Sequence, residues 1–376
     1  DASEVLNRVV NAVKSNKGID VLTSTVVKEA KGFIGNFEVT VQKENAETTN
    51  LGVGTIVVAT GAANFEPVGM FGYKEYDNVI TQLELERRLK DGRLERPDRV
   101  VMIQCVGSRQ ETGRTYCSRV CCMTALKNAL LIKEVYPDAE VYLLFRDLQT
   151  YGKEYEGYYS DARRKFVQFI KYVPERPPEV ISKPSGKLIV RTYDTLLDSE
   201  IEIDSDLVVL STPLIQHEDA KELSQILKVP LGPNEFFFEA HVKLRPVDFA
   251  TDGIYVCGTA HGPKDVAESI NQAYAVASRA AVPMAVKKLR TEAITATVNE
   301  ILCKGCGRCE EVCEYNAINV EEIKSAVGAP ALVAKVIEAQ CKGCGSCAVA
   351  CPTGAITMKH FTDRQINAMI EAAIGG

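Results

Sequence analysis

Near its C-terminus the chain reads Cys303-Lys-Gly-Cys-Gly-Arg-Cys-Glu-Glu-Val-Cys313, and 38 residues later it reads Cys341-Lys-Gly-Cys-Gly-Ser-Cys-Ala-Val-Ala-Cys351. Both runs have the spacing C-x2-C-x2-C-x3-C, and Ala317-Ile318 recurs at the same offset as Ala355-Ile356. Four cysteines at this spacing are typical of 4Fe–4S cluster ligands. The repeat therefore predicts an α+β two-cluster domain of the bacterial ferredoxin type over residues 295–359.

The fourth cysteine of each run is expected to bind the cluster of the other run, as in two-cluster ferredoxins. The first cluster then takes Cys303, Cys306, Cys309 and Cys351, and the second takes Cys341, Cys344, Cys347 and Cys313. Glycines between the cysteines let the backbone turn tightly. Pro352 follows the last cysteine as the motif expects, whereas Glu314 stands where the first run would have proline. The alternative is zinc, whose sites use C-x2-C pairs separated by a spacer and fit this pattern less well.

Four more cysteines lie in the middle of the chain. Cys105 follows an expected strand over 100–104, and Cys117, Cys121 and Cys122 stand at the start of an expected helix over 121–136. A helix N-terminus lowers thiol pKa values, which suits cluster ligation. The pattern predicts a third cluster on these four cysteines, with buried small apolar side chains as the alternative. Cys257, alone in a strand, is expected in the core.

The first 290 residues have the pattern of an α/β fold. Strands are expected over 19–22, 37–42, 55–59, 100–104, 141–145, 188–193, 200–203, 207–211 and 254–258, and helices over 81–90, 121–136, 160–172 and 265–289. In the tail, 360–376, Ile366, Met369, Ile370 and Ile374 fall at helical spacing. We expect a helix there that packs on its own protein, and a helix that docks on a partner is the alternative.

Two segments are typical of flavin-binding dinucleotide folds. One is Thr55-Ile-Val-Val-Ala-Thr-Gly61, and the other is Thr251-Asp-Gly-Ile-Tyr-Val-Cys-Gly258, followed by a helix from residue 265. The N-terminus of that helix would stabilise negative charge on a flavin or a phosphate. The expected FAD contacts are Thr60, Gly61, Gly258, Thr259, Ala260, Lys264 and Asp265. Lys264 is a candidate to stabilise an anionic flavin, and a solvent-facing loop lysine is the alternative.

The phosphate-binding parts of such folds are missing from the sequence. No G-x-G-x-x-G follows a strand and opens a helix. The βαβ unit that would hold the FAD pyrophosphate is therefore expected in another segment or chain. The second α/β unit carries Cys105-Val-Gly-Ser-Arg109 where a nicotinamide fingerprint would lie, so NAD(P)H is not expected as the direct electron donor.

Composition excludes several classes of protein. The chain has 376 residues, 46% hydrophobic and 25% charged, enough for a core and for two or three domains. A net charge of −6 argues against a nucleic-acid partner, and no run of apolar residues is long enough to span a membrane. The start, Asp1-Ala2-Ser3-Glu4, has no signal-peptide pattern, so we expect a cytoplasmic protein. It also lacks Met, so a processed chain, a fragment or one part of a split protein is expected.

Three further motifs complete the pattern: Val101-Met-Ile-Gln-Cys-Val-Gly-Ser-Arg109, Tyr116-Cys-Ser-Arg-Val-Cys-Cys-Met123 and Gly152-Lys-Glu-Tyr-Glu-Gly-Tyr-Tyr159. With the flavin segment and the ferredoxin repeat, they resemble the C-terminal portion of the HdrA family, the A-type subunits of heterodisulfide reductases in methanogens and other anaerobes. The resemblance implies a thioredoxin-reductase-like core with two dinucleotide folds, FAD, and a third 4Fe–4S cluster on the middle cysteines. It divides the chain into a partial FAD domain (1–95, completed by 245–292), a second α/β unit (96–244), the ferredoxin domain (295–359) and a tail helix (360–376).

The resemblance also implies a function. The chain would be part of an oxidoreductase, active only within a complex, and would transfer electrons between FAD and 4Fe–4S clusters. Flavin-based electron bifurcation would divide them between ferredoxin and a branch that reduces the CoB–CoM heterodisulfide. The implied partners are B- and C-type subunits, a hydrogenase or formate dehydrogenase, ferredoxin, an N-terminal half-chain that completes the FAD site, and a second copy in a homodimeric core. The alternatives are a non-bifurcating relay of a quinone-interacting or acyl-CoA-reducing complex, and a scaffold without flavin chemistry.

Overall fold

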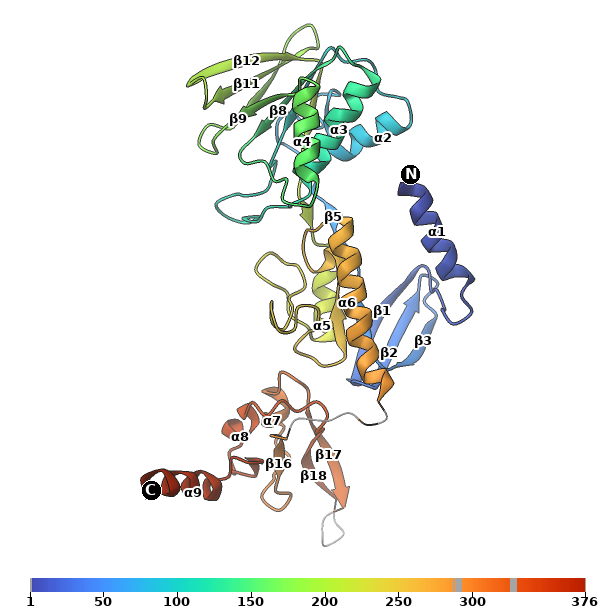
Figure 1. Ribbon diagram of the computed structural model, residues 1–376. Coiled ribbons are helices and arrows are strands. Elements are labelled where there is room, and N and C mark those ends of the chain that lie inside the picture. Colours follow the sequence, from blue (N-terminus) through green and yellow to red (C-terminus); the bar gives the residue numbers. More distant parts are fainter. Residues whose placement is uncertain (1, 287, 289–292, 325–329, 376) are drawn as a thin grey trace.

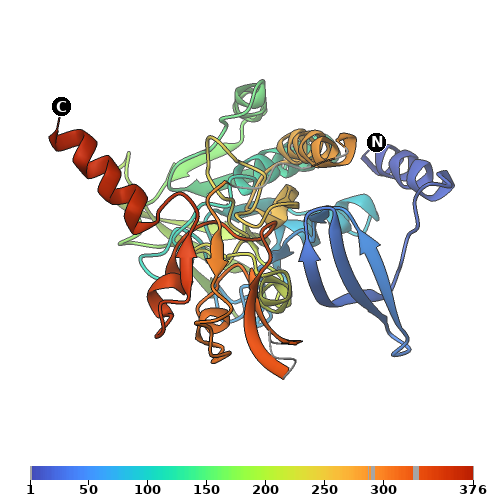
Figure 2. The same ribbon diagram turned by 90° about the horizontal axis from the view of Figure 1, so that it is seen from below.

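The computed structural model describes residues 2–286, 288, 293–324 and 330–375. Figure 1 shows three bodies along the chain: a sheet with its helices at the top, a middle body that contains the long helix α6 (Val266–Ala285), and the cysteine-rich domain at the bottom. Helices α1 (Ala2–Ser15) and α9 (Asp363–Ile374) carry the two chain ends and project on opposite sides of the molecule in Figure 2.

The top body is built on a parallel five-stranded sheet in the order β6-β13-β7-β8-β9. These strands are Val79–Thr81, Leu207–Leu210, Arg99–Ile103, Glu140–Phe145 and Gln168–Lys171. Parallel sheets are usually buried on both faces, and Val100 to Ile103 are completely buried. One face packs against α2 (Gln82–Lys90), α3 (Cys121–Val135) and α4 (Tyr155–Arg164). The other packs against the antiparallel sheet of β10 (Glu179–Ser182), β11 (Leu188–Asp194) and β12 (Ser199–Ser205).

The middle body combines an antiparallel sheet with a short parallel pair. The antiparallel sheet is β1 (Thr25–Phe33), β2 (Asn36–Lys43) and β3 (Thr48–Val53), and the parallel pair is β4 (Ile56–Val58) and β15 (Ile254–Val256). They share one core with α5 (Ala220–Leu227). A second short pair, β5 (Ala63–Asn64) and β14 (Leu214–Ile215), lies where the chain passes between the bodies. Among the described residues the outer edge of β4 has no strand partner, and Val57 on that strand is 44% exposed.

The cysteine-rich domain consists of two interlocked halves. Strand β16 (Ala296–Val298) pairs with β19 (Ile356–Met358), and β17 (Ile318–Lys324) pairs with β18 (Pro330–Val336). Short helices α7 (Arg308–Glu311) and α8 (Ser346–Ala350) carry the third cysteine of each run. At the 38-residue offset, the start of β17 corresponds to β19 and the end of β18 to β16. Each strand pair is therefore the image of the other, as the sequence repeat predicts.

The structure confirms the expected α/β core followed by an α+β domain, with two local errors in the expected elements. No strand forms over 19–22, and the first strand begins at Thr25. The expected helix over 160–172 ends at Arg164, and Gln168–Lys171 instead joins the sheet as β9. Between them Phe166 adopts a left-handed φ of 61°, which ends the helix. Helix α6 ends at Ala285, and residue 289, the expected end, lies outside the described residues.

The tail helix is present, but its environment differs from the expectation. Every residue from Asp363 to Ile374 is exposed, including Met369 and Ile370 on its apolar stripe. The expectation that this helix packs on its own protein is therefore wrong for the described part of the chain. None of the described helices has the length and apolarity needed to cross a membrane.

The packing can be compared with the domain division expected from the sequence. Strand β6 and helix α2, which lie in the range 1–95, belong to the five-stranded sheet and its helical layer. Helix α5, which lies in the range 96–244, shares the core of the middle body. The chain thus crosses between these two bodies more than once. The division into these ranges stays a proposal. By their packing, β6 and α2 belong with the second α/β unit, and α5 belongs with the middle body.

Candidate iron–sulfur and flavin sites

The second cysteine run gathers around one small cavity. Cys341, Cys344 and Cys347 line this cavity, and the fourth cysteine on its wall is Cys313, which belongs to the first run. Cys341 and Cys347 are buried, whereas Cys344 is exposed. The cavity is therefore walled by three thiols of one repeat and one thiol of the other.

The first run forms the counterpart group. Cys309 is buried and lies within electrostatic range of Cys303 and Cys306. Cys351 corresponds to Cys313 at the repeat offset, and its thiol lies 3.6 Å from Thr353 Oγ1. Cys309 lies in the core of the domain, Cys303 and Cys351 pack against that core, and Cys306 is exposed. Cys351 therefore stays the predicted fourth ligand beside Cys303, Cys306 and Cys309.

Backbone N–H groups donate to the sulfurs in a pattern that follows the repeat. Ala334 N–H donates to Cys303 Sγ at 3.4 Å, and Ala296 N–H donates to Cys341 Sγ at the same distance. Both donors lie on strands, and each is 38 residues from the other. In the first half Ala317 N–H also donates to Cys313 Sγ at 3.2 Å. Such donors stabilise the negative charge that thiolates carry when they bind a cluster.

Two glycines allow the backbone of each cysteine run to pass close to the backbone of a segment in the other part of the domain. Gly305 has a φ of 61°, and a Cβ on it would lie 2.6 Å from Leu332 O. Gly343 has a φ of 65°, and a Cβ there would lie 2.5 Å from Ile294 O. Neither position tolerates a side chain, because both the conformation and the backbone contact exclude it. The sequence correctly identified the tight turns, but this close approach is visible only in the fold.

The thiol pKa values show what ligation must overcome. Burial, with the charges of Cys341 and Cys344, raises the pKa of Cys347 to about 11. Burial also acts to raise the pKa of Cys351, but hydrogen bonds from Thr353 and the following backbone lower it overall. Cluster binding must therefore displace a firmly held proton at Cys347.

Across the described residues no three His, Cys, Asp or Glu side chains converge on a single metal-ion position. A cubane does not require that arrangement, because each of its four thiolates binds a different iron atom. The donor set here is thiols alone, with backbone N–H groups directed at the sulfurs, and it fits an iron–sulfur cluster.

The middle cysteines gather at the carboxyl edge of the five-stranded sheet. Cys105 follows β7, and Cys121 and Cys122 open α3. The charges of Cys122 and Cys117 act on Cys105, and those of the other three act on Cys121, so the fold brings all four thiols together. Cys105 adopts a φ of 62°, which turns the chain out of the strand. Ligands of open parallel sheets bind at this edge, and the four thiols stand where a dinucleotide would otherwise lie.

Cations surround this group. Burial and the charge of Cys122 raise the pKa of Cys105 to about 11, while Arg109 and Arg146 act in the opposite direction. A hydrogen bond with Cys121 lowers the pKa of Cys122 to about 7 despite its burial. Arg146 Nη1 donates to the backbone O of Arg109 at 2.8 Å, and the guanidinium of Arg109 forms an ion pair with Asp147 at 2.8 Å. These positive charges offset the negative charge of a thiolate-bound cluster.

Gln104 supplies an independent sign that a group is to be bound here. Its side chain is completely buried, and neither Nε2 nor Oε1 has a hydrogen-bond partner among the described residues. The neighbouring buried amide of Gln82 is satisfied at both atoms, since Oε1 accepts from Asn128 Nδ2 at 2.8 Å and Nε2 donates to Ser211 Oγ at 3.2 Å, whereas Asn128 Oδ1 also lacks a partner among the described residues. An unpaired buried amide is costly. Its place directly before Cys105 fits a hydrogen bond to a cluster sulfur, so the residues present fit the third cluster.

The expected flavin residues meet at the ends of β4 and β15. The two strands are parallel neighbours, so the loops that follow them lie together. A Cβ on Gly61 would lie 3.8 Å from Thr259 Oγ1, which places the segments of Thr60 and Ala260 at one edge. Gly258 has a φ of 67°, and no other atom lies within 4 Å of the position that a Cβ would take. A ligand that approaches the backbone closely requires such open space. These residues fit the ring and ribityl part of a flavin, whereas no pyrophosphate loop lies among them.

Lys264 is not a solvent-facing loop residue, so that alternative is wrong. It is only 9% exposed, and Nζ donates to Gly258 O at 2.7 Å and to Gly262 O at 2.8 Å. Burial lowers the pKa of Lys264 to about 8. Next in the chain, Asp265 caps α6, accepting from Glu268 N–H at 2.7 Å. Lys264 thus fastens the loop, and its ammonium lies beside the backbone expected to meet the flavin.

One set of residues links the flavin loop to the middle cysteines. Arg119, two residues before Cys121, donates from Nη2 to Glu268 Oε1 at 2.6 Å and lies over the ring of Tyr151. A cavity of about 340 Å³ opens beside this contact, lined among others by Arg119, Tyr151, Lys264 and Asp265. The loop of the cluster ligands and the N-terminus of α6 therefore share one wall.

Sequence reasoning missed a polar network under the flavin loop. Gln272 Oε1 accepts from Gly258 N–H at 3.0 Å, so its Nε2 is the atom directed at His261 Nδ1, 2.7 Å away. His261 Nε2 then donates to Glu239 Oε2 at 2.7 Å. The network fixes the orientation of Gly258. Its members are separated by up to 33 residues, and no local pattern in the sequence indicates that they meet.

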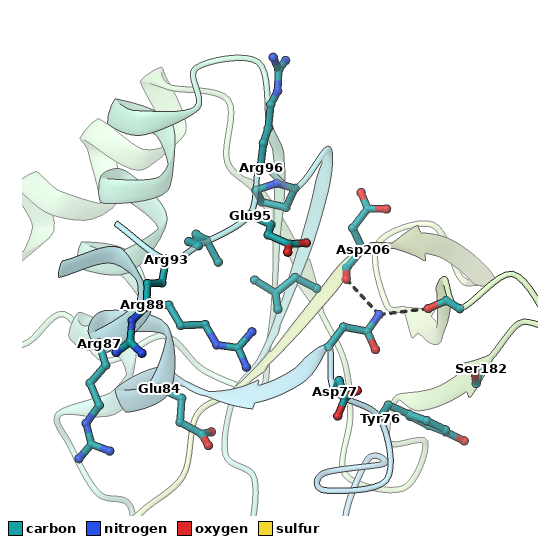
Figure 3. Close-up of a pocket in the computed structure, with 15 residues that line it drawn as sticks. Tyr76, Asp77, Glu84, Arg87, Arg88, Arg93, Glu95, Arg96, Ser182 and Asp206 are labelled. Carbon is teal, nitrogen blue, oxygen red and sulfur yellow. Dashed lines mark hydrogen bonds between the residues drawn. The ribbon is translucent and has the colours of Figure 1, made fainter. Parts of the chain in front are cut away.

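A further cavity lies away from all of these residues (Figure 3). It measures about 880 Å³ and lies at the amino edge of the sheet, where Asp206 and Asn78 precede strands β13 and β6. Asn78 Nδ2 donates to Asp206 O at 3.0 Å. In Figure 3 Arg96 and Arg87 point away in opposite directions. None of the expected site residues lines this cavity.

Comparison with known proteins agrees with this picture. Residues 302–355 match the family described as "4Fe-4S dicluster domain", which favours the ferredoxin interpretation over zinc. The A-type subunit of the "H(2):CoB-CoM heterodisulfide,ferredoxin reductase" of Methanothermobacter marburgensis is 44% identical over 345 residues, 88% of this chain and 51% of that protein. The A-type subunit of the "H(2)/formate:CoB-CoM heterodisulfide,ferredoxin reductase" of Methanococcus maripaludis is 46% identical over 296 residues, 74% of this chain and 44% of that protein.

Two solved structures share part of this arrangement at low sequence identity. Thioredoxin reductase of T. acidophilum is 15% identical, with a TM-score of 0.47 over 75% of this chain and 79% of that one. The NAD-dependent persulfide reductase of A. fulgidus is 17% identical, with a TM-score of 0.43 over 86% of this chain and 57% of that one.

The fold and the cysteine runs define an iron–sulfur protein in which an α/β core is followed by a 4Fe–4S dicluster domain. More particularly, the chain belongs to the HdrA family, the A-type subunits of heterodisulfide reductases. It spans about half the length of the curated relatives it matches.

The buried ammonium of Lys264 gives a pH-dependent stability. Its pKa is about 8 in the folded chain and 10.5 in the ordinary state, so between these values the unfolded chain binds more protons. The free energy of unfolding contributed by this group should therefore rise as pH increases from 8 to 10.5. Lys264→Met should remove this rise in urea titrations across that window, whereas the exposed Lys221→Met should retain it. Parallel profiles for wild type and Lys264→Met would contradict the burial argument.

Gln104 gives a prediction for the cluster proposed on the middle cysteines. Removing its donor in Gln104→Leu should lower the midpoint potential of that cluster by the equivalent of about 1 kcal/mol, since a hydrogen bond to sulfur stabilises the reduced form. The matched control is Gln82→Leu, a buried amide at the same sheet edge with protein partners. A redox titration followed by electron paramagnetic resonance measures both. An unchanged potential in Gln104→Leu with the cluster present would mean that this amide bonds elsewhere.

Proposed function

We propose that this chain is the iron–sulfur flavoprotein subunit of a heterodisulfide reductase-type complex and transfers electrons between FAD and 4Fe–4S clusters. Family membership supports the assignment to this class. The observation that carries the proposal is the shared wall between the middle cysteines and the flavin loop, joined by Arg119 and Glu268. A redox centre on the cysteines and a flavin at the loop would lie side by side.

Three clusters are proposed. One takes Cys303, Cys306, Cys309 and Cys351, one takes Cys341, Cys344, Cys347 and Cys313, and one takes Cys105, Cys117, Cys121 and Cys122. The crossed cavity, the repeated N–H donors and the unpaired amide of Gln104 support these sets.

Bound FAD would supply the conversion between two-electron and one-electron transfer. The chain's own residues have supporting tasks. Gly258 presents an open backbone, held in place by Gln272. Lys264 keeps an ammonium beside it, which would favour negative charge on a reduced ring. The N-terminus of α6 would also favour negative charge on the ring. Tyr155 donates a 2.6 Å hydrogen bond to Asp265, the N-cap residue of that helix.

The FAD site is proposed to need a further segment. A parallel sheet of two strands is unusual, because parallel sheets are normally larger and covered on both faces. Here β4 has an open edge among the described residues, and Val5, Leu6 and Val9 on α1 are more than half exposed. An N-terminal half-chain or a partner chain that adds parallel strands beside β4 would cover these surfaces and bring the missing pyrophosphate loop.

Electron bifurcation between ferredoxin and a disulfide-reducing branch is the finer proposal. The names of both relatives above join a heterodisulfide and ferredoxin, which supports it. The proposed partners are B- and C-type subunits, a hydrogenase or formate dehydrogenase, ferredoxin and a second copy of the chain, in the cytoplasm. No observation favours a non-bifurcating relay. A flavin semiquinone that is strongly unstable in the intact complex supports bifurcation, and a stable one contradicts it.

Metal analysis tests the three ligand sets. On the rule of four iron atoms per cluster, we expect about 12 iron and 12 sulfide per chain. Cys122→Ala should lower both to about 8 and leave the ferredoxin-type spectrum unchanged. The matched control is Cys257→Ala, a buried cysteine outside the three sets, which should keep the full content. About 8 of each in the wild type would remove the middle cluster from the proposal, and tightly bound zinc without sulfide would overturn all three.

Flavin titration tests the incomplete FAD site. Because no helix N-terminus among the flavin residues carries a pyrophosphate loop, we expect this 376-residue chain alone to bind FAD weakly. The intact complex should bind it tightly. Equally tight binding in both would mean that a loop within this chain holds the phosphates.

A further inference from the structure

The cysteine-rich domain contacts the middle body through its second cysteine run. Lys342, the residue after Cys341, forms an ion pair with Asp252 in the turn before β15. Gln340, the residue before Cys341, donates from Nε2 to Gly32 O on β1. Both contacts flank the same proposed ligand and reach two different segments of the middle body. They fix the orientation of the domain more firmly than one contact would.

The ion pair continues into a network of charged residues that ends on one buried carboxylate, that of Asp248. Asp252 Oδ1 also accepts from Arg245 at 3.0 Å, and Arg245 lies 3.7 Å from Asp248. Asp248 is buried and accepts from Arg279 of α6 at 2.8 Å. A cavity of about 400 Å³ at this junction is lined by Cys341 and by members of the network. The contact partner of Lys342 is therefore held in place by Arg245, which links it to Asp248 and to α6 of the middle body.

A second member of the same ligand set also lies near the middle body. Burial lowers the pKa of Lys228, at the end of α5, and the charge of Cys313 acts in the opposite direction. Cys313 and Lys228 are thus within electrostatic range. Two of the four thiols that wall the crossed cavity therefore lie against the middle body.

The first run presents no such contact. Lys304 is the repeat counterpart of Lys342, with the same neighbours in sequence, Cys303 and Gly305. Lys304 is exposed, and within the described ranges it forms no ion pair or hydrogen bond through its side chain. Sequence repetition thus supplies two lysines in the same local setting, of which one is docked and the other faces solvent.

We propose that the set Cys341, Cys344, Cys347 and Cys313 holds the inner cluster of the domain, next to the flavin-type core, and that Lys342 and Asp252 fix this orientation. The inference rests on the ligand sets proposed above. With clusters bound, the inner set would accept a single electron from the core and pass it to the outer set, Cys303, Cys306, Cys309 and Cys351, from which it would leave to a one-electron carrier protein outside the chain. Each centre gains and loses one electron, and no bond is made or broken. Transfer inwards follows the same order reversed.

Charge reversal tests the docking contact in the cluster-loaded chain. Lys342→Glu should release the domain, and small-angle X-ray scattering should show a larger radius of gyration. Lys304→Glu, the matched control with the same change of charge, should leave the radius unchanged. The double variant Lys342→Glu with Asp252→Lys should restore it. Iron content is measured in each variant to establish that the domain is folded and loaded. Equal radii for Lys342→Glu and wild type, or equal expansion by Lys304→Glu, would overturn the proposed contact.

Paramagnetic relaxation tests which cluster is inner. Cys344→Ser and Cys306→Ser change equivalent exposed ligands of the two sets. A soluble paramagnetic relaxation agent should act more strongly on the ferredoxin-type cluster that remains in reduced Cys344→Ser, the outer one, than on the ferredoxin-type cluster that remains in reduced Cys306→Ser, the inner one. The opposite result would make the first set the inner one and overturn the proposal. If the wild type has no middle-cluster signal, the three-cluster proposal fails instead, and the scattering experiment still decides the docking contact.

Discussion

A thiolate-bound cluster places negative charge inside a protein, and the need to stabilise that charge governs the arrangement of this molecule. In the cysteine-rich domain the stabilisation comes from backbone N–H groups, with Ala296 and Ala334 donating across the repeat. At the carboxyl edge of the sheet it comes from guanidinium groups near Cys105. Both solutions need a chain that turns sharply. The left-handed conformations of Cys105, Gly305 and Gly343 supply those turns.

The same constraint explains why the second α/β unit keeps its sheet while it has no nucleotide fingerprint. Strand β7 and helix α3 follow one another as the strand and helix that bind phosphates do in dinucleotide folds, but here a long loop over residues 104–120 joins them. The loop carries Cys105 and the helix begins with Cys121 and Cys122. A site built for an anionic ligand, with a helix N-terminus and nearby arginines, suits an anionic cluster as well. With the proposed middle cluster, the scaffold would be retained while the bound group changes.

The sequence was most informative where function depends on short spacing. The cysteine runs, their glycine turns and the internal repeat predicted the α+β domain. The cysteines and glycines of each run lie within a dozen residues of one another, so their spacing can be recognised in the sequence. Sequence reasoning failed where distant segments compete or meet. Helical periodicity over 160–172 was overridden by the sheet, which takes Gln168–Lys171 as β9. The burial of Lys264, the unpaired amide of Gln104 and the link from Glu239 to Gly258 depend on tertiary contacts, which local patterns do not encode.

The internal repeat also has a consequence for how direction arises in an electron-transfer domain. The two halves share ligand spacing, glycine turns and N–H donors, so their isolated chemistry is nearly the same. What distinguishes them is the neighbour of one lysine: Lys342 meets a carboxylate of the middle body, and Lys304 faces solvent. A duplicated, almost symmetric pair of redox centres thereby acquires an entrance and an exit. The direction of electron transfer is then set by the contact between the cysteine-rich domain and the middle body. This direction can change during evolution without any change in the metal ligands.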